Sequence, residues 1–353
     1  MEISEIQVDG YEKVMRCRDE ETGLHALIAV HDTTLGPALG GMRMLPYTSE
    51  DEALFDVLRL SRGMTYKSAV AETGLGGGKS VIIGDPKTMK TPALFRSMGS
   101  FVDSLGGLYI TAEDMNIGIE DLEHVRETTR WVTGLSRESG SSGNPSPYTA
   151  RGCLQGMKAV MEEIHGNQDF EGRRIVIQGV GAVGGRLAMM LKEAGASVVI
   201  CDINEQRVAE LCEEHGFEAT KDEVHHTLEC DIYAPCARGA GLNDTTIPQL
   251  HCKAVAGCAN NQLLEFRHAD DLRKRGILYA PDYVINAGGI INVSIEIEPG
   301  GYDEQRALEK ISNIPRALKD IYARAKEEAI TTAEAAQKVA ESILREGAAA
   351  AAR

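Results

Sequence analysis

The sequence predicts an α/β protein of two domains. At 353 residues the chain is longer than most single cores, and its 43% hydrophobic residues can fill more than one. In the second half, apolar strands alternate with helical stretches, which is typical of a parallel sheet with helices on both faces. A segment rich in turn formers, 134–147, precedes this half and is expected to connect the domains.

Charge and hydropathy argue against several classes of partner. The formal net charge of -16 and the lack of a Lys/Arg-rich block disfavour nucleic acid and anionic membranes. We find no apolar run of about 18 residues and no charged-then-apolar leader, so we expect a soluble, cytoplasmic protein. The eight cysteines show no C-x-x-C pair and no metal-ligand spacing. We therefore expect reduced, buried thiols and no metal site.

The first half begins with a predicted strand at 24–31, followed by the glycine-rich segment 36–41. Glycines in such a segment either form a turn or let a ligand approach the backbone, and the sequence does not choose between the two. Apolar residues at helical spacing then predict a helix over 49–64. Ser49 and Glu52 are placed to form a capping box at its start.

Lys79 is the residue of this half that most needs a chemical explanation. It follows glycines 76–78 and precedes the apolar strand 81–83, so partial desolvation is expected. Burial, and a second cation such as Lys67, would lower its pKa from about 10.4 to about 7 or 8. Lys79 would then be a general base at neutral pH. The alternative is a surface lysine after a flexible loop.

Another strand is predicted at 108–112, and it ends in Glu113 and Asp114. Acids at a strand end are well placed to face a cleft. The competing interpretation is that they cap the helix predicted at 119–126.

A complete dinucleotide-binding pattern occupies 174–202. A strand leads into Gly179, which permits a tight turn, Gly181, which lets the backbone approach a pyrophosphate, and Gly184, which lets a helix pack on the strand. The helix amino terminus would face the phosphates. Asp202 ends the next strand, where an acid bonds the adenosine ribose and disfavours a 2'-phosphate, so NAD is preferred over NADP. An ordinary strand-turn-helix joint is the alternative.

The remaining elements continue the alternation. Helices are predicted over 149–163, from a cap at Asn204 to Gly216, and through 302–345 with a capping box at Thr331, whereas the closing residues 347–353 are expected to fray. Strands are expected at 230–234, 254–258 and 277–280.

Amide side chains follow two of these segments. Asn260 and Asn261 lie after a strand, at the edge where open parallel sheets bind ligands. Asn286 precedes two glycines, where ordinary loop chemistry is an equal alternative.

Eight motifs, in order and spacing, together resemble the glutamate/leucine/phenylalanine/valine dehydrogenase family over about residues 25 to 330. The motifs are Gly36-Pro-Ala-Leu-Gly-Gly41, Gly63-Met-Thr-Tyr-Lys67, Gly76-Gly-Gly-Lys79, Thr111-Ala-Glu-Asp114, Gly143-Asn-Pro-Ser-Pro147, Gly179-Val-Gly181, Cys258-Ala-Asn-Asn261-Gln and Pro281-Asp-Tyr-Val-Ile-Asn286-Ala-Gly-Gly289.

The resemblance implies reversible oxidative deamination, in which an L-amino acid, NAD and water give a 2-oxo acid, ammonium and NADH. It implies that Lys67 binds the substrate carboxylate with help from the backbone of Gly40 and Gly41. Lys79 would activate the attacking water, and Asp114 would move protons to and from the amino nitrogen. The residues expected at the cofactor are Thr149, Gly179, Gly181, Val183, Gly184, Asp202, Asn260, Asn261 and Asn286. A catalytically silent NAD-binding protein is the alternative from another class, but such a protein would be expected to lose one of the two lysines or the acid.

The substrate side chain is expected to be apolar. Glutamate dehydrogenases look as if they use a lysine at the position of Leu39, which cannot bind a carboxylate. The matching pocket positions are Leu39, Met64, Ala112, Ile290 and Val293, and two branched residues among them suit leucine, valine or isoleucine. An aromatic or broad specificity is the alternative, since a methylene is worth only about 1 to 3 kcal/mol. Met42 and the pair 115–116 depart from the leucine-type pattern and bear on this choice.

The resemblance also implies two domains with a cleft between them. The substrate-binding and oligomerisation domain is expected over 1–133, completed by C-terminal helices at about 326–353, and the Rossmann-type NAD-binding domain over 143–325. A homo-oligomer is expected, with no choice between dimer and octamer.

Overall fold

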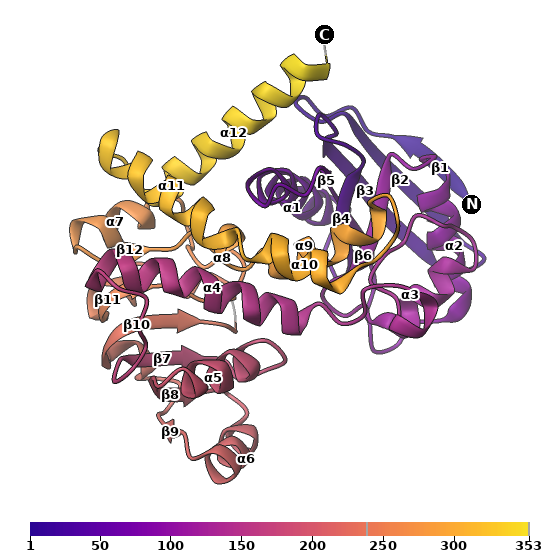
Figure 1. Cartoon of the computed structure of the whole chain (residues 1–353). Helices are drawn as coiled ribbons and strands as arrows, with labels where there is room; N and C mark the ends of the chain where they lie inside the picture. Colours follow the sequence, from indigo (N-terminus) through magenta and orange to yellow (C-terminus); the bar gives the residue numbers. More distant parts are fainter. Residues whose placement is uncertain (238, 352–353) are drawn as a thin grey trace. The chain divides into compact units, whose positions relative to one another are not determined.

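The computed structural model describes residues 1–237 and 239–351, which form two compact units (Figure 1). Unit 1 comprises Met1–Asn144, Val293–Asp303 and the described residues from Ala340 onward. Unit 2 comprises Pro145–Asn292 and Glu304–Val339. The unit boundary at 144/145 falls inside the predicted connection, whereas the C-terminal part changes unit at positions that the sequence pattern does not mark. The predicted cleft between the domains stays a prediction.

Unit 1 is built on a mixed sheet with the strand order β1-β2-β3-β5-β4-β6. Neighbours pair antiparallel from β1 to β5, whereas β4 runs parallel to both β5 and β6. The strands are β1 (Glu2–Glu5), β2 (Lys13–Asp19), β3 (Leu24–Asp32), β4 (Ala38–Leu45), β5 (Gly76–Ile83) and β6 (Tyr109–Glu113).

Helices cover both faces of this sheet. Leu27 and Val81 pack with Val57 of α1 (Glu50–Val70) on one face. Their neighbours Ile28 and Ile82 belong to the core formed with α2 (Pro92–Asp103) and α3 (Ile119–Arg126) on the other. Because successive strand residues point to opposite faces, this alternation assigns the residues of β4, β5 and β6, and those of β3 up to Val30, to the α1 face or the α2 face.

Unit 2 has a parallel sheet with the order β12-β11-β10-β7-β8-β9, which confirms the predicted sheet type. Its strands are β7 (Arg174–Gln178), β8 (Ser197–Cys201), β9 (Glu218–Ala219), β10 (Glu229–Pro235), β11 (His251–Val255) and β12 (Leu278–Tyr279). The helices of the C-terminal half are α4 (Ser146–His165), α5 (Gly184–Glu193), α6 (Glu205–His215), α7 (His268–Lys274), α8 (Asp282–Ile285), α9 (Gly288–Ser294), α10 (Glu304–Ile311), α11 (Ile314–Glu327) and α12 (Thr332–Ala351). Of these, α9 and α12 contribute residues to both units.

The predicted cap side chains are in place, but the box expected at α1 is only half formed, because the Glu52 carboxylate accepts from Thr48 N at 2.7 Å rather than from the N-cap residue. Ser49 Oγ accepts a hydrogen bond from Glu52 N at 3.1 Å, and Asn204 Oδ1 accepts one from Arg207 N at 3.1 Å. At the start of α12 the Thr331 hydroxyl accepts from Glu334 N at 3.1 Å. The Glu334 carboxylate accepts in return from Thr331 N at 2.8 Å, which completes the predicted box.

Several predicted boundaries are wrong. Helix α1 continues to Val70, so Lys67 lies in its last turn, and β5 begins at Gly76, so Lys79 lies within a strand rather than after a loop. Glycine disfavours strands in isolation, and the pairing of β5 with β3 and β4 overrides that preference. The end expected to fray is helical to Ala351, while residues 352 and 353 lie outside the described ranges. Within those ranges no helix has the length and hydrophobicity needed to cross a bilayer.

Candidate active site

The strand parity of unit 1 brings the predicted catalytic and pocket residues to one face. In β5, Lys79 lies two residues before Val81 and therefore points to the α1 face. In β4, Met42 and Met44 belong to the α2 face, so Leu39 and Gly41 point to the α1 face. In β6, Tyr109 belongs to the α2 face, which turns Ala112 toward α1. The α1 face of three neighbouring strands is therefore the candidate site.

A buried ion pair joins the two residues predicted to do acid–base work. Lys79 Nζ lies 3.1 Å from Asp114 Oδ2, and the two side chains are 5% and 23% exposed. The same carboxylate oxygen accepts a hydrogen bond from Arg43 Nε at 2.7 Å. Arg43 also donates to Asp56 of α1 at 3.0 Å, and Asp56 accepts from the Tyr47 hydroxyl at 2.8 Å. Asp114 is thus held by two cations, one of which is itself anchored to α1.

This environment shifts the pKa values of both groups downward. Burial lowers the pKa of the Lys79 ammonium, and the charge of Arg43 adds to that effect, although Asp114 opposes it. Burial alone would raise the pKa of Asp114, but Lys79 and Arg43 outweigh it and hold that pKa at about 2. The direction of the shift predicted for Lys79 is confirmed, and Arg43 is a cation that contributes to it.

Gly40 and Gly41 are glycines because the backbone is closely packed around them. They lie inside β4 rather than in a turn. A Cβ at Gly40 would stand 1.7 Å from Gly78 O, and one at Gly41 would stand 2.7 Å from Asp114 Cβ. Any side chain at Gly41 would therefore displace the carboxylate that pairs with Lys79. Contact of these glycines with a substrate stays a prediction.

The helix-cap alternative for Asp114 is wrong. The N-cap of α3 is Gly118, whose N–H donates to Asp121 Oδ2 at 2.9 Å. The Asp114 carboxylate is instead committed to Lys79 and Arg43.

The remaining substrate-site residues lie on several elements. Met64 and Lys67 are half-buried residues of α1, and Leu39 is buried in unit 1. Ile290 and Val293 lie three residues apart on α9, which places them on one helical face, but the first belongs to unit 2 and the second to unit 1. Their joint role in one pocket stays a prediction.

The positions that depart from the leucine-type pattern differ in exposure. Met42 is fully buried in the core on the α2 face, on the side of the sheet opposite Lys79. Met115 is 51% exposed, and Asn116 donates to Met44 O at 2.9 Å from a left-handed backbone conformation. Met42 therefore does not line the face that carries Lys79.

The glycine-rich loop of unit 2 has the geometry of a dinucleotide cradle. Gly179 has φ +96°, and its Cβ would stand 2.6 Å from Ala237 Cβ. A Cβ at Gly184 would stand 2.0 Å from Gly179 O, so the start of α5 packs closely on the turn that follows β7. Among the described residues, a Cβ at Gly181 would meet no atom within 4 Å. Internal packing therefore does not explain Gly181, and close approach of a ligand to its backbone stays a prediction. Val183 precedes α5 as its N-cap.

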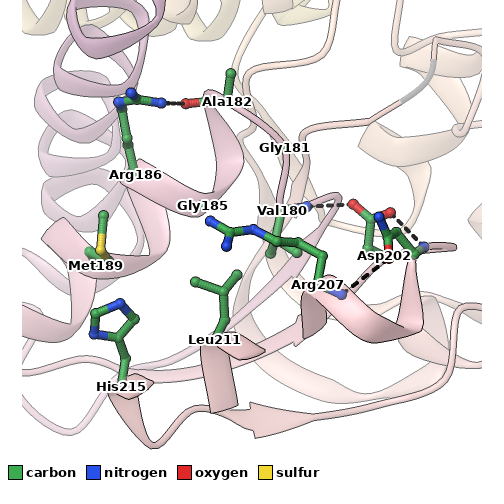
Figure 2. Close-up of a pocket in the computed structure, with 11 residues that line it drawn as sticks. Val180, Gly181, Ala182, Gly185, Arg186, Met189, Asp202, Arg207, Leu211 and His215 are labelled. Atoms are coloured by element: carbon green, nitrogen blue, oxygen red, sulfur yellow. Dashed lines mark hydrogen bonds between the residues drawn. The ribbon is translucent and has the colours of Figure 1, made fainter. Parts of the chain in front are cut away.

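A pocket of about 540 Å³ adjoins this loop (Figure 2). Asp202 stands at its edge, where Oδ2 accepts from Val180 N at 2.8 Å and Oδ1 accepts from Asn204 N at 2.9 Å. Arg186, Arg207 and His215 also line the pocket, and Arg186 donates to Ala182 O. These residues fit a polar group bound beside the carboxyl end of β8.

Two amides predicted separately are joined at the end of β11. Asn286 is 3% exposed, and its Nδ2 donates to Cys258 O at 3.1 Å and to Asn260 Oδ1 at 2.6 Å. These hydrogen bonds are compatible with ordinary loop chemistry, so the role of Asn286 at the cofactor stays a prediction. Asn261 has a left-handed backbone with φ 51°. On α4, the Thr149 hydroxyl donates to Pro145 O at 3.1 Å. A Cβ at Gly289 would stand 2.6 Å from the same hydroxyl oxygen, so the two residues are closely packed.

Arg43 is the functional residue that sequence reasoning missed. It lies two residues after Gly41 in the same strand, so the period of two places it on the face of Lys79. The signal available in the sequence was a cation two residues after Gly41, because that spacing places the cation on the same face of the strand. Arg207 of the Asp202 pocket was also missed, because its position depends on how α6 packs beside the loop.

Two family models match the two parts of the chain. A family model described as Glu/Leu/Phe/Val dehydrogenase, dimerisation domain, matches residues 11–131. A second, described as Glutamate/Leucine/Phenylalanine/Valine dehydrogenase, matches 140–204 and 201–353.

Two relatives and one solved structure are similar over nearly the whole chain. Leucine dehydrogenase of Geobacillus stearothermophilus is 52% identical over 331 residues, covering 94% of this chain and 90% of that protein. Phenylalanine dehydrogenase of Thermoactinomyces intermedius is 48% identical over 332 residues, with the same coverage. The crystal structure of L-tryptophan dehydrogenase from Nostoc punctiforme has a TM-score of 0.84 at 42% identity and covers 96% of both chains.

Proposed function

Since the chain belongs to the glutamate/leucine/phenylalanine/valine dehydrogenase family, we propose that it oxidises branched-chain aliphatic L-amino acids with NAD. Membership makes it an amino-acid dehydrogenase that uses a nicotinamide cofactor. In the proposed reaction, an L-amino acid, NAD⁺ and water give a 2-oxo acid, ammonium, NADH and a proton. The reverse reaction is reductive amination.

The Lys79–Asp114 pair is the observation that carries the proposal. Deamination needs a base that takes a proton from water at the imino carbon and a second group that exchanges protons with the departing nitrogen. Lys79 has a lowered pKa and Asp114 lies 3.1 Å from its Nζ. Two unlike proton carriers in contact are what such a sequence of transfers requires.

Residues of this chain would act in a fixed order. Lys67 binds the substrate carboxylate, and the backbone of Gly40 and Gly41 supports it. NAD, when bound, accepts hydride from the substrate α-carbon. Asp114 takes a proton from the substrate ammonium before that transfer. Lys79 then takes a proton from the attacking water, and Asp114 returns its proton to the amino nitrogen as the carbon–nitrogen bond breaks. Arg43 orients Asp114 through the 2.7 Å hydrogen bond from its Nε.

NAD rather than NADP is proposed because of Asp202. Its carboxylate lies at the edge of the pocket beside the glycine-rich loop and is held by two backbone N–H groups. A negative charge fixed there repels a 2'-phosphate and accepts hydrogen bonds from ribose hydroxyls. The residues proposed for the nicotinamide side are Thr149, Asn260, Asn261 and Asn286.

Leucine, valine and isoleucine are proposed because Leu39 is apolar and buried on the face that carries Lys79. If glutamate were the substrate, its side-chain carboxylate would be buried beside Leu39, which cannot supply a cation. The relatives named phenylalanine dehydrogenase and tryptophan dehydrogenase support an aromatic substrate as the second candidate.

A substitution at Leu39 tests the substrate assignment. Leu39→Lys should raise the glutamate-to-leucine ratio of kcat/KM by at least roughly tenfold, because the new cation pairs with a carboxylate and disfavours an aliphatic chain. Leu39→Met keeps size and polarity and serves as the control. An unchanged glutamate-to-leucine ratio of kcat/KM in Leu39→Lys would show that Leu39 does not line the substrate pocket. Failure of the wild type to form NADH with every amino acid tested would refute the whole proposal.

Assembly and location complete the proposal. The amino-terminal family model is that of a dimerisation domain, which supports a homo-oligomer formed through unit 1. We place the protein in the cytoplasm, where amino acids, ammonium and the cofactor are available. Sedimentation velocity that finds only a monomer at micromolar concentration would contradict the oligomer.

A further inference from the structure

A cysteine, an aspartate and a histidine meet at the edge of the sheet in unit 2. Cys201 is the last residue of β8, whereas Asp222 and His225 follow β9. One possible ligand atom from each side chain lies within 4.8 Å of the other two. His225 Nε2 is 3.9 Å from Asp222 Oδ1, too far for a hydrogen bond. Because Asp222 is distant from Cys201 in the chain, cysteine spacing could not reveal this group.

The cluster holds buried polar atoms that lack partners. Cys201 is fully buried, and the side chains of His225 and Asp222 are 11% and 35% exposed. Within the described part of the chain, Asp222 Oδ1 and His225 Nδ1 are both buried and have no hydrogen-bond partner. Buried polar atoms nearly always have a hydrogen-bond partner, and a bound ion is one of the known reasons when they do not.

We propose that Cys201, Asp222 and His225 bind a divalent transition-metal ion, with zinc as the best match. Thiolate, imidazole and carboxylate are the ligands that zinc takes in proteins. A thiolate among them disfavours magnesium and calcium, which prefer oxygen alone. Binding forms a metal–sulfur bond and releases the Cys201 thiol proton to solvent. The resulting thiolate and the Asp222 carboxylate balance the two positive charges of the ion.

The distance between two of the three proposed ligand groups is close to that around a bound zinc ion. Zinc bond lengths of about 2.0 to 2.3 Å in a tetrahedron place neighbouring ligand atoms roughly 3.4 to 3.6 Å apart. The 3.9 Å from His225 Nε2 to Asp222 Oδ1 is close to that value, so Nε2 is the imidazole ligand atom and Asp222 Oδ1 is the partnerless atom that the ion would satisfy. The His225 ring also stacks on Tyr233, with centroids 5.5 Å apart and an interplanar angle of 6°, so its orientation is fixed by packing.

A second group of similar composition in the same unit does not support a metal. Asp244, His268 and Asp271 also lie close together. Arg267, however, donates to both carboxylate oxygens of Asp244 at 2.7 Å. A guanidinium already supplies the positive charge there, and the group has no thiol.

The role inferred for the metal is structural. It would tie the carboxyl end of β8 to the segment after β9, on the strand that also carries Asp202 at its end. The inference does not depend on the reaction catalysed.

Cobalt binding to the full-length protein tests the proposal. After dialysis against a chelator, Co²⁺ should bind at about one ion per chain and produce the near-ultraviolet absorption of a sulfur–cobalt bond. Cys201→Ser should abolish that absorption, and His225→Gln should weaken binding by at least roughly tenfold. Zinc should displace the cobalt and bleach the band.

Matched variants separate this site from the other thiols. Cys212→Ser, on α6 outside the cluster, should leave the band and the affinity unchanged. Circular dichroism and NADH formation report whether each variant folds. If Cys201→Ser does not fold, cobalt binding to His225→Gln and to Asp222→Asn tests the proposal instead. Failure to bind cobalt stoichiometrically would overturn the proposal. So would a band that survives in Cys201→Ser, or binding that is unaffected by both variants of the segment after β9.

Discussion

Replacement of Lys79 by alanine should abolish most turnover without unfolding the protein. General acid–base catalysis contributes about 10²- to 10⁴-fold, so kcat should fall by that factor, equivalent to roughly 3 to 5 kcal/mol of barrier. Asp114 would keep its hydrogen bond from Arg43 at 2.7 Å, so the substitution does not leave a buried carboxylate unpaired. Affinity for NAD should stay within about twofold, because the proposed cofactor residues Gly179, Gly184 and Asp202 are unaffected.

The pH profile separates a base from a merely structural lysine. Only the neutral amine accepts a proton, so wild-type kcat/KM should rise with pH through the pKa of Lys79, which burial places below its ordinary value. Lys79→Ala should lose that limb. Stopped-flow absorbance of NADH over a pH series measures both, with the exposed Lys87→Ala as the control. A near-wild-type rate in Lys79→Ala, or an unchanged profile, would refute the assigned role.

Three further predictions concern cofactor choice, packing and acid stability. Asp202→Ser should raise kcat/KM with NADP by on the order of tenfold, since it removes a like charge while Arg207 remains in the pocket; an unchanged NADP rate would contradict this. Gly184→Ala should lower the free energy of unfolding by about 1 to 3 kcal/mol and weaken NAD binding, because the alanine Cβ would meet Gly179 O at 2.0 Å. Calorimetry measures the stability and a binding titration measures the affinity for NAD. Unaltered values of both would contradict the prediction. The folded-state pKa of Asp114, about 2, lies below its unfolded value, so the stabilisation by its carboxylate is present above about pH 4 and is lost as pH falls toward 2. In acid unfolding, the stability advantage of the wild type over Asp114→Asn should therefore shrink over that range. A constant difference in stability would refute this prediction.

Local signals predicted much of the fold. Capping side chains act within one helical turn, so Ser49, Asn204 and Thr331 could be assigned from sequence alone. The glycine-rich loop could also be assigned, because strand, glycines, helix and Asp202 follow one another in the chain. Such features depend on neighbours in sequence rather than on tertiary contacts.

Tertiary packing decided what the sequence could not. The glycines before Lys79 indicated a loop, yet pairing with β3 and β4 makes them part of β5. Arg43 was missed because its role depends on Asp114, which reaches it only when β4 and β6 pair in parallel. The hydrogen bond between Asn260 and Asn286 likewise joins two segments that no local pattern connects.

The substrate assignment rests on an apolar pocket, and a panel of amino acids tests it most directly. We would measure kcat/KM for NADH formation at alkaline pH with leucine, valine, isoleucine, phenylalanine, tryptophan and glutamate. The account predicts a maximum with leucine, valine or isoleucine and little turnover of glutamate. Turnover of phenylalanine or tryptophan above that of leucine would contradict the pocket, although the roles of Lys79 and Asp114 would stand.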